Sequence, residues 1–130
     1  MRIPDDNRIR ISSGSPYEDR VGFSRAIRVA GRVHVAGTAP IPQDGSTPPE
    51  SPYDQMLLCG QIVATALAAA GASLADVVRT RMFIADASYA DDVAKAHREV
   101  FAQTRPAATM VITQLLDPAW TVEIEVEAAV

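Results

Sequence analysis

Three glutamates at alternate positions near the C-terminus, Glu123, Glu125 and Glu127, are the first candidates for chemistry. In a β-strand they share one face, because strand side chains alternate between the two faces. Such a row is most often a solvated strand surface. One of the three, turned into a cleft, could instead serve as a general acid or base, because neighbouring like charges raise the pKa of a carboxyl group. Both interpretations stay open from the pattern alone.

Three arginines could act on an anionic ligand. Arg79 and Arg81 share a face of another predicted strand, where they could pair with the glutamates or bind a substrate carboxylate. Arg105 directly precedes Pro106, so we expect an extended or turn conformation there. Its side chain either reaches an anionic ligand or lies on the surface.

Other catalytic arrangements find no support in the residue spacing. The two histidines, His34 and His97, have no metal-ligand spacing with each other or with Cys59. Cys59 is the single cysteine and lies in an apolar helical run, so we expect a buried side chain and no internal disulfide. No serine stands in a nucleophile elbow, and no glycine-rich phosphate loop follows a strand. We therefore expect no metal and no cofactor.

Length and charge narrow the class of protein further. The chain has 130 residues, which fits one domain, and a net charge of −4 with scattered basic residues, so we expect no nucleic-acid partner. No apolar run approaches the roughly 20 residues that span a membrane. Residues 1–6 lack the apolar region of a signal peptide. We expect a cytoplasmic protein without a membrane partner.

The periodicities predict the element order ββ–α–β–α–ββ in a single domain, residues 1–130. This is an α+β class with a mixed β-sheet and two helices packed on one face. The opposite face also carries apolar side chains, and a second subunit would cover it most simply. The expected segments are an N-terminal extension (1–20), strands (23–29, 32–36, 77–85, 107–115, 120–129), helices (54–70, 86–101) and a proline-rich surface loop (40–52).

Several segments together resemble the Rid (YjgF) family. Phe23–Val29 is similar to the family's Tyr-Ser-x-Ala-hydrophobic stretch, and Val33–Pro40 to its strand ending in Ser-Gly-Gln-x-Pro. Further matches are Ala70–Val78, the Pro106-Ala107 pair and Glu123-Ile124-Glu125. The resemblance runs from about residue 20 to the end. It implies a chorismate-mutase-like subunit and a homotrimer with a barrel core and three clefts between subunits.

The resemblance also implies a site. In the deaminase branch an arginine binds the substrate carboxylate, a glutamate with backbone groups positions the attacking water, and tyrosine, serine and asparagine line the pocket. Glu123 matches the glutamate, with Gly37 nearby. The arginine, tyrosine, serine and asparagine positions hold Ala108, Phe23, Ala36 and Ala94. The remaining lining is expected at Thr109, Met110, His97 and Gln114.

These replacements shape the expected function. Losing the arginine removes charge-assisted hydrogen bonds worth about 1.5–3 kcal/mol each. We expect a Rid-like protein that hydrolyses a small-molecule imine, enamine or related labile C–N intermediate other than a 2-imino acid. The alternative is a non-catalytic trimer that binds a small metabolite or acts as a regulatory module. A ribonuclease function ranks third, since nothing in this acidic chain supports it.

Overall fold

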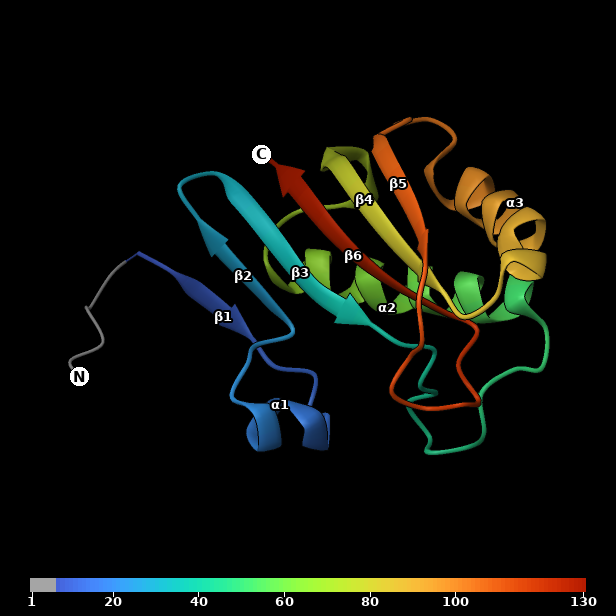
Figure 1. Ribbon diagram of the computed structural model, residues 1–130. Coiled ribbons are helices and arrows are strands. Elements are labelled where there is room, and N and C mark those ends of the chain that lie inside the picture. Colours follow the sequence, from blue (N-terminus) through green and yellow to red (C-terminus); the bar gives the residue numbers. More distant parts are fainter. Residues whose placement is uncertain (1–6) are drawn as a thin grey trace.

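The computed structural model describes residues 7–130. Its strands form one six-stranded sheet in the order β1-β2-β3-β6-β4-β5 (Figure 1). Only β4 and β5 pair in parallel, and every other neighbouring pair is antiparallel, so the predicted mixed sheet is confirmed. The strands are β1 (Ile9–Ile11), β2 (Ala26–Val29), β3 (Arg32–Thr38), β4 (Val77–Ile84), β5 (Ala107–Ile112) and β6 (Val122–Ala129). The helices are α1 (Pro16–Val21), α2 (Pro52–Ala69) and α3 (Ala90–Phe101).

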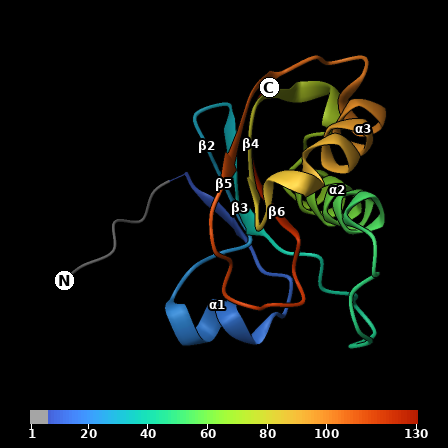
Figure 2. The same ribbon diagram turned by 45° about the vertical axis from the view of Figure 1, so that its right-hand side comes forward.

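Helices α2 and α3 lie together on one face of the sheet, as Figure 2 shows from the side. The core forms between them and the sheet. Alternate residues of β6, among them Ile124 and Val126, point into this core with at most 1% exposure, and α2 meets them with Met56, Cys59, Val63 and Leu67, all fully buried. Each fully buried Leu or Val contributes roughly 1.5–3 kcal/mol. The same alternation turns the three glutamates to the other face.

The ends of α2 follow from its sequence. The Ser51 hydroxyl accepts a hydrogen bond from the Asp54 amide at 3.0 Å, and Pro52 occupies the first helical turn, where its missing N–H costs nothing. Gly71 follows the helix with φ of +79°, a conformation that glycine adopts without a Cβ penalty. In the described part of the chain, residues 7–130, no helix is both long and apolar enough to span a membrane.

The N-terminal segment contains two short elements. Residues 1–20 are expected as a polar, turn-rich N-terminal extension, and within the described residues β1 pairs with β2 and α1 follows it. A three-residue strand and a six-residue helix are too short to show a periodicity. The buried Glu18 of α1 accepts hydrogen bonds from Ser12 and Ser13 and so ties the two elements together. The expectation of no signal peptide falls on residues 1–6 and lies outside the described residues.

Candidate functional site

The site begins with an irregularity where β3 meets β6. Val35 faces Val126, but Thr38 faces Ile124, so β3 carries one extra residue at Ala36–Gly37. Such a β-bulge re-aims the strand and is frequent beside active sites. It sets Gly37 against Glu123: a Cβ built on this glycine would lie 3.4 Å from Glu123 Oε2. The bulge and the glycine together bring backbone and carboxylate into contact.

A pocket of about 260 Å³ opens beside this contact. Gly37, Glu123, Glu125 and Phe83 line it from the sheet, and residues 113–116 between β5 and β6 close another side with Gln114, Leu115 and Leu116. Ligand pockets usually span about 300–1,000 Å³, so this pocket as it stands suits a small molecule. Part of its lining is apolar, and the Glu123 carboxylate is partly withdrawn from water there.

Burial raises the pKa of Glu123 above the ordinary glutamate value of 4.5. The Arg25 guanidinium opposes this shift, and the neighbouring Glu125 carboxylate adds to it. A carboxylate with a raised pKa that is still ionised near neutral pH is a stronger base than an exposed one. Glu123 is therefore suited to accept a proton from water.

Arg25 is the residue that the sequence analysis missed. It lies just before β2, with only 8% of its surface exposed, and its Nη1 donates to the Gly37 carbonyl and to Thr38 Oγ1, both at 3.1 Å. The Phe23 ring lies 5.4 Å from the guanidinium carbon, so Phe23 packs against Arg25. The one available signal was the position of Arg25, two residues after Phe23 on a predicted strand face.

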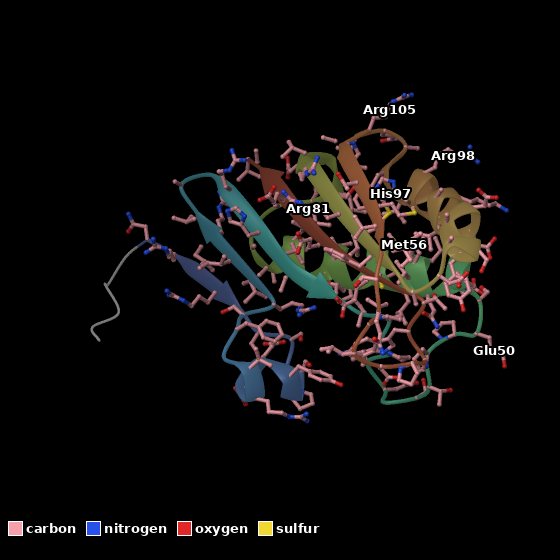
Figure 3. All side chains as sticks on the ribbon, viewed as in Figure 1. Glu50, Met56, Arg81, His97, Arg98 and Arg105 are labelled. Carbon is pink, nitrogen blue, oxygen red and sulfur yellow. The ribbon has the colours of Figure 1, made fainter. Side chains whose placement is uncertain are left out.

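Three of the expected site residues lie on the opposite side of the sheet. Ala108 pairs with Thr80 and Met110 with Met82, both of which point toward the helices, and Met110 packs against the core. His97 of α3 shares a hydrogen bond with Thr80 Oγ1 at 2.8 Å, and burial lowers its pKa. Figure 3 shows His97 beside α3, away from Arg81 on the sheet. Within one subunit the sheet separates His97, Ala108 and Met110 from Glu123.

The other candidates occupy separate places. Thr109 lies on the glutamate face and accepts a hydrogen bond from Arg79 Nη2 at 2.9 Å. Arg81 pairs with Glu125 at 3.2 Å, so for this arginine the pairing interpretation is confirmed. Ala94 is exposed on α3. Arg105 is an exposed turn residue with φ of +47°, and it points away from the sheet in Figure 3.

Within residues 7–130 no group of three His, Cys, Asp or Glu side chains is arranged to hold a metal ion. Cys59 is fully buried, as expected, and its Sγ contacts the Thr38 carbonyl at 3.4 Å. Burial raises the pKa of this thiol far above its usual value, which makes it a poor nucleophile. Glu123 is thus the described side chain best placed for acid–base chemistry in the pocket.

Comparison with known proteins agrees with this architecture. The family model described as Endoribonuclease L-PSP matches residues 15–130. The chain belongs to this family. An uncharacterized protein of Streptomyces coelicolor is 37% identical over 120 residues, covering 92% of this chain and 90% of that protein. The sheet and helices are therefore those of the Rid (YjgF) family, as the resemblance implied.

Solved structures of the endoribonuclease L-PSP family superpose closely. Rv2704 of Mycobacterium tuberculosis, a member of the YjgF/YER057c/UK114 family, is 38% identical with a TM-score of 0.87, covering 95% of this chain and all of that one (100%). TdcF of E. coli, solved with bound serine, is 20% identical with a TM-score of 0.78 and covers 93% of each chain, which shows a shared fold. The chorismate-mutase-like subunit that the resemblance implied is the fold observed.

Proposed function

We propose that this chain is an enzyme that hydrolyses a reactive imine, enamine or related labile C–N intermediate other than a 2-imino acid. One observation carries the proposal: a partly buried glutamate with a raised pKa stands against the Gly37 bulge in a pocket of mixed polar and apolar lining. The resemblance to the deaminase branch of the Rid family implies the reaction class, hydrolysis of a C–N intermediate. A trimer is part of the proposal, because three of the site candidates, His97, Ala108 and Met110, lie across the sheet from Glu123.

The reaction needs one base. Ionised Glu123 accepts a proton from water while the water oxygen bonds to the C=N carbon and the π electrons move to nitrogen. Glu123 then returns the proton to nitrogen, which gives a carbinolamine. The carbinolamine hydroxyl loses its proton as the C–N bond breaks, a carbonyl forms, and ammonia or an amine leaves with that proton. One water is consumed, and an enamine enters after protonation at carbon.

The pocket supports a substrate without a carboxylate. Glu123 and Glu125 are the charged side chains among the described residues that line it. Arg25 already donates to the Gly37 carbonyl and to Thr38, and Arg81 already pairs with Glu125. A 2-imino acid would bring a third carboxylate to this place without a free cation to receive it, which costs binding energy. Neutral imines avoid that repulsion.

The test uses amine and amino-acid oxidases to generate imines in situ, with semicarbazide trapping those that survive. We expect the wild type to lower the trapped signal for neutral imines and not for 2-imino acids. Glu123→Gln should lose roughly 10²-fold or more in kcat/KM, because a general base typically contributes that much. Glu127→Gln, on the same face but outside the pocket, is the matched control and should keep activity.

The pH profile gives a second reading of the same group. Activity needs ionised Glu123, so it should fall as the pH drops through the pKa of Glu123, and this limb should lie above 4.5. Unchanged turnover in Glu123→Gln would overturn the mechanism.

One observation favours a second function, that of a non-catalytic binding module. The positions of arginine, serine and asparagine in the deaminase branch hold Ala108, Ala36 and Ala94, so the polar groups that act on substrate are missing. TdcF, which shares the fold, holds serine in its structure. A metabolite that raises the melting temperature and is recovered chemically intact would favour binding.

An RNA-cleavage assay tests the ribonuclease activity that the family's description names. We expect no cleavage, because two carboxylates in the pocket repel phosphates.

A further inference from the structure

Arg25 has no part in the mechanism above, yet the fold keeps its charge out of water at a cost. Only 8% of its surface is exposed, and burial lowers its pKa. Among the described residues its Nε–H is buried without a hydrogen-bond partner. Natural proteins rarely leave a buried donor unpaired, because this costs about 1–3 kcal/mol. A guanidinium that fulfilled only a packing role would be replaced by an apolar side chain at a gain in stability.

The side-chain hydrogen bonds of Arg25 converge on the bulge in β3. Its Nη1 joins the Gly37 carbonyl to Thr38 Oγ1, and the Thr38 hydroxyl in turn donates to the Ala36 carbonyl at 2.8 Å. Ala36 and Gly37 form the bulge that sets Gly37 against Glu123, and Thr38 follows it. The bulge is therefore braced from one point, and the brace is the guanidinium.

Titratable groups on three other elements interact with the guanidinium. Glu18 lies on α1, Cys59 on α2, and Glu123 on β6 with Glu125 as its neighbour. Burial alone would raise the pKa of Glu18, but hydrogen bonds from Ser13 and Ser12 outweigh it and hold the pKa below its usual value, so Glu18 stays ionised. Cys59 stays neutral in its buried position. Arg25 thus interacts electrostatically with two carboxylates, Glu18 in a structural position and Glu123 in the pocket.

We propose that Arg25 is a positioning residue for Glu123: it braces the bulge at Gly37, and among residues 7–130 it is the buried cation that acts on the Glu123 carboxylate. The role rests on the proposed function for its effect on turnover. The position of Glu123 and its response to Arg25 are properties of the folded protein, and they are measured without substrate.

The test compares Arg25→Met, Arg25→Lys and the control Arg28→Met. Methionine keeps an unbranched chain without charge. Lysine keeps the charge as a compact ammonium on a flexible stem, without the rigid guanidinium that holds Nη1 against Gly37 and Thr38. Arg28 lies on β2, and its Nη1 donates to the Ala70 carbonyl at 2.9 Å on the helix side, so Arg28→Met controls for the loss of a nearby arginine. Carbon-13 NMR of labelled glutamate side chains follows the titration of Glu123, assigned by its absence in Glu123→Gln.

In Arg25→Met the titration midpoint of Glu123 should move to higher pH, because the cation that opposes its protonation is gone. The Gly37 amide resonance should shift with it. Arg25→Lys should restore most of the midpoint and little of the Gly37 shift, and Arg28→Met should change neither. A folded Arg25→Met or Arg25→Lys with the wild-type Glu123 titration and Gly37 resonance would overturn the proposal. If Arg25→Met does not fold, the Gly37 amide resonance of Arg25→Lys decides: a shifted resonance supports the proposal, and an unshifted one overturns it.

Turnover gives a separate reading on any imine that the wild type accepts. Arg25→Met should lower kcat by roughly 10-fold to 10²-fold with little change in KM, because a misplaced base costs rate more than binding. Its acidic limb should follow the NMR midpoint upward. If the wild type hydrolyses no imine, the proposed function fails, and the NMR measurements still decide whether Arg25 positions Glu123.

Discussion

At the scale of single residues, titratable groups acquire their properties from the faces of the sheet on which they lie. Glu123 is partly desolvated on the open face, and burial raises its pKa. His97 lies on the helix side, where burial lowers its pKa and the Thr80 hydroxyl holds the ring. Both shifts favour the neutral form, because a low dielectric disfavours either charge. Of these two groups, Glu123 borders the pocket and His97 does not.

His97 should make the stability of the protein depend on pH. Its pKa is lower in the folded state than the ordinary 6.5, so the unfolded chain binds a proton first as the pH falls. The stability that neutral His97 contributes is therefore present above pH 6.5 and is lost as the pH falls through its folded pKa. The measurement is the free energy of unfolding in urea between pH 5 and 8, compared with His97→Leu.

The difference between wild type and His97→Leu cancels the other titrating groups, because they are common to both proteins. This difference should shrink toward acid pH. If it is constant across the range, His97 titrates alike in the folded and unfolded states and its burial has no such effect.

At the scale of elements, the loops around the pocket depend on one buried side chain. Gln55 on α2, 2% exposed, donates from Nε2 to the carbonyls of Pro49 and Ala119 at 2.8 and 2.9 Å. Its Oε1 accepts from the Thr121 amide and hydroxyl, both at 2.7 Å. One amide thus joins the proline-rich loop to the segment that runs between the pocket wall and β6. All of its hydrogen-bonding capacity is used.

Gln55→Ala should destabilise the protein by about 1–3 kcal/mol or more, because it leaves buried backbone groups unpaired. Gln61→Ala removes the same side chain from an exposed position of α2 and should change stability by less than about 0.5 kcal/mol. Urea unfolding measures both. Hydrogen exchange should also show earlier loss of protection at Thr121 in Gln55→Ala. Equal protection in both variants would contradict the role of Gln55 in holding this segment.

At the scale of the whole molecule, the residues expected to form the site are divided between the two faces of the sheet. Gly37, Gln114 and Glu123 meet at one pocket, while His97, Ala108 and Met110 lie across the sheet. A second subunit placed against the edge strand β5 could bring the two groups together. Val111 on that strand is 41% exposed and Leu116 beside the pocket is 88% exposed, and large apolar side chains of this kind are typical of an interface.

We expect a trimer in solution, three times the 13.9 kDa of one chain, by sedimentation at micromolar concentration. Val111→Asp should weaken the trimer, because it places a charge on the glutamate side of β5. Val21→Asp is the control, since Val21 is 72% exposed on α1 at the far end of the sheet (Figure 1). A monomeric wild type would contradict both the assembly and a site shared between subunits.

The sequence alone determined the features that repeat along the chain. The alternation in β6 predicted both a strand and a row of glutamates on one face, and the apolar spacing of α2 predicted a buried helix with Cys59 inside it. These patterns are local, because each residue's environment repeats every two or every 3.6 positions. The sequence did not predict β1 or α1, because neither element is long enough to show a periodicity.

Only the tertiary structure decided which residues meet. Arg25 precedes β2 and Glu123 lies on β6, far apart in the sequence. Both reach Gly37, because β3 lies between β2 and β6 with one extra residue at Ala36–Gly37. Sheet order and register also placed Ala108 on the helix side, away from Glu123. Strand order and bulges decide which side chains become neighbours on one face of the sheet. Neither produces a periodic pattern in the sequence.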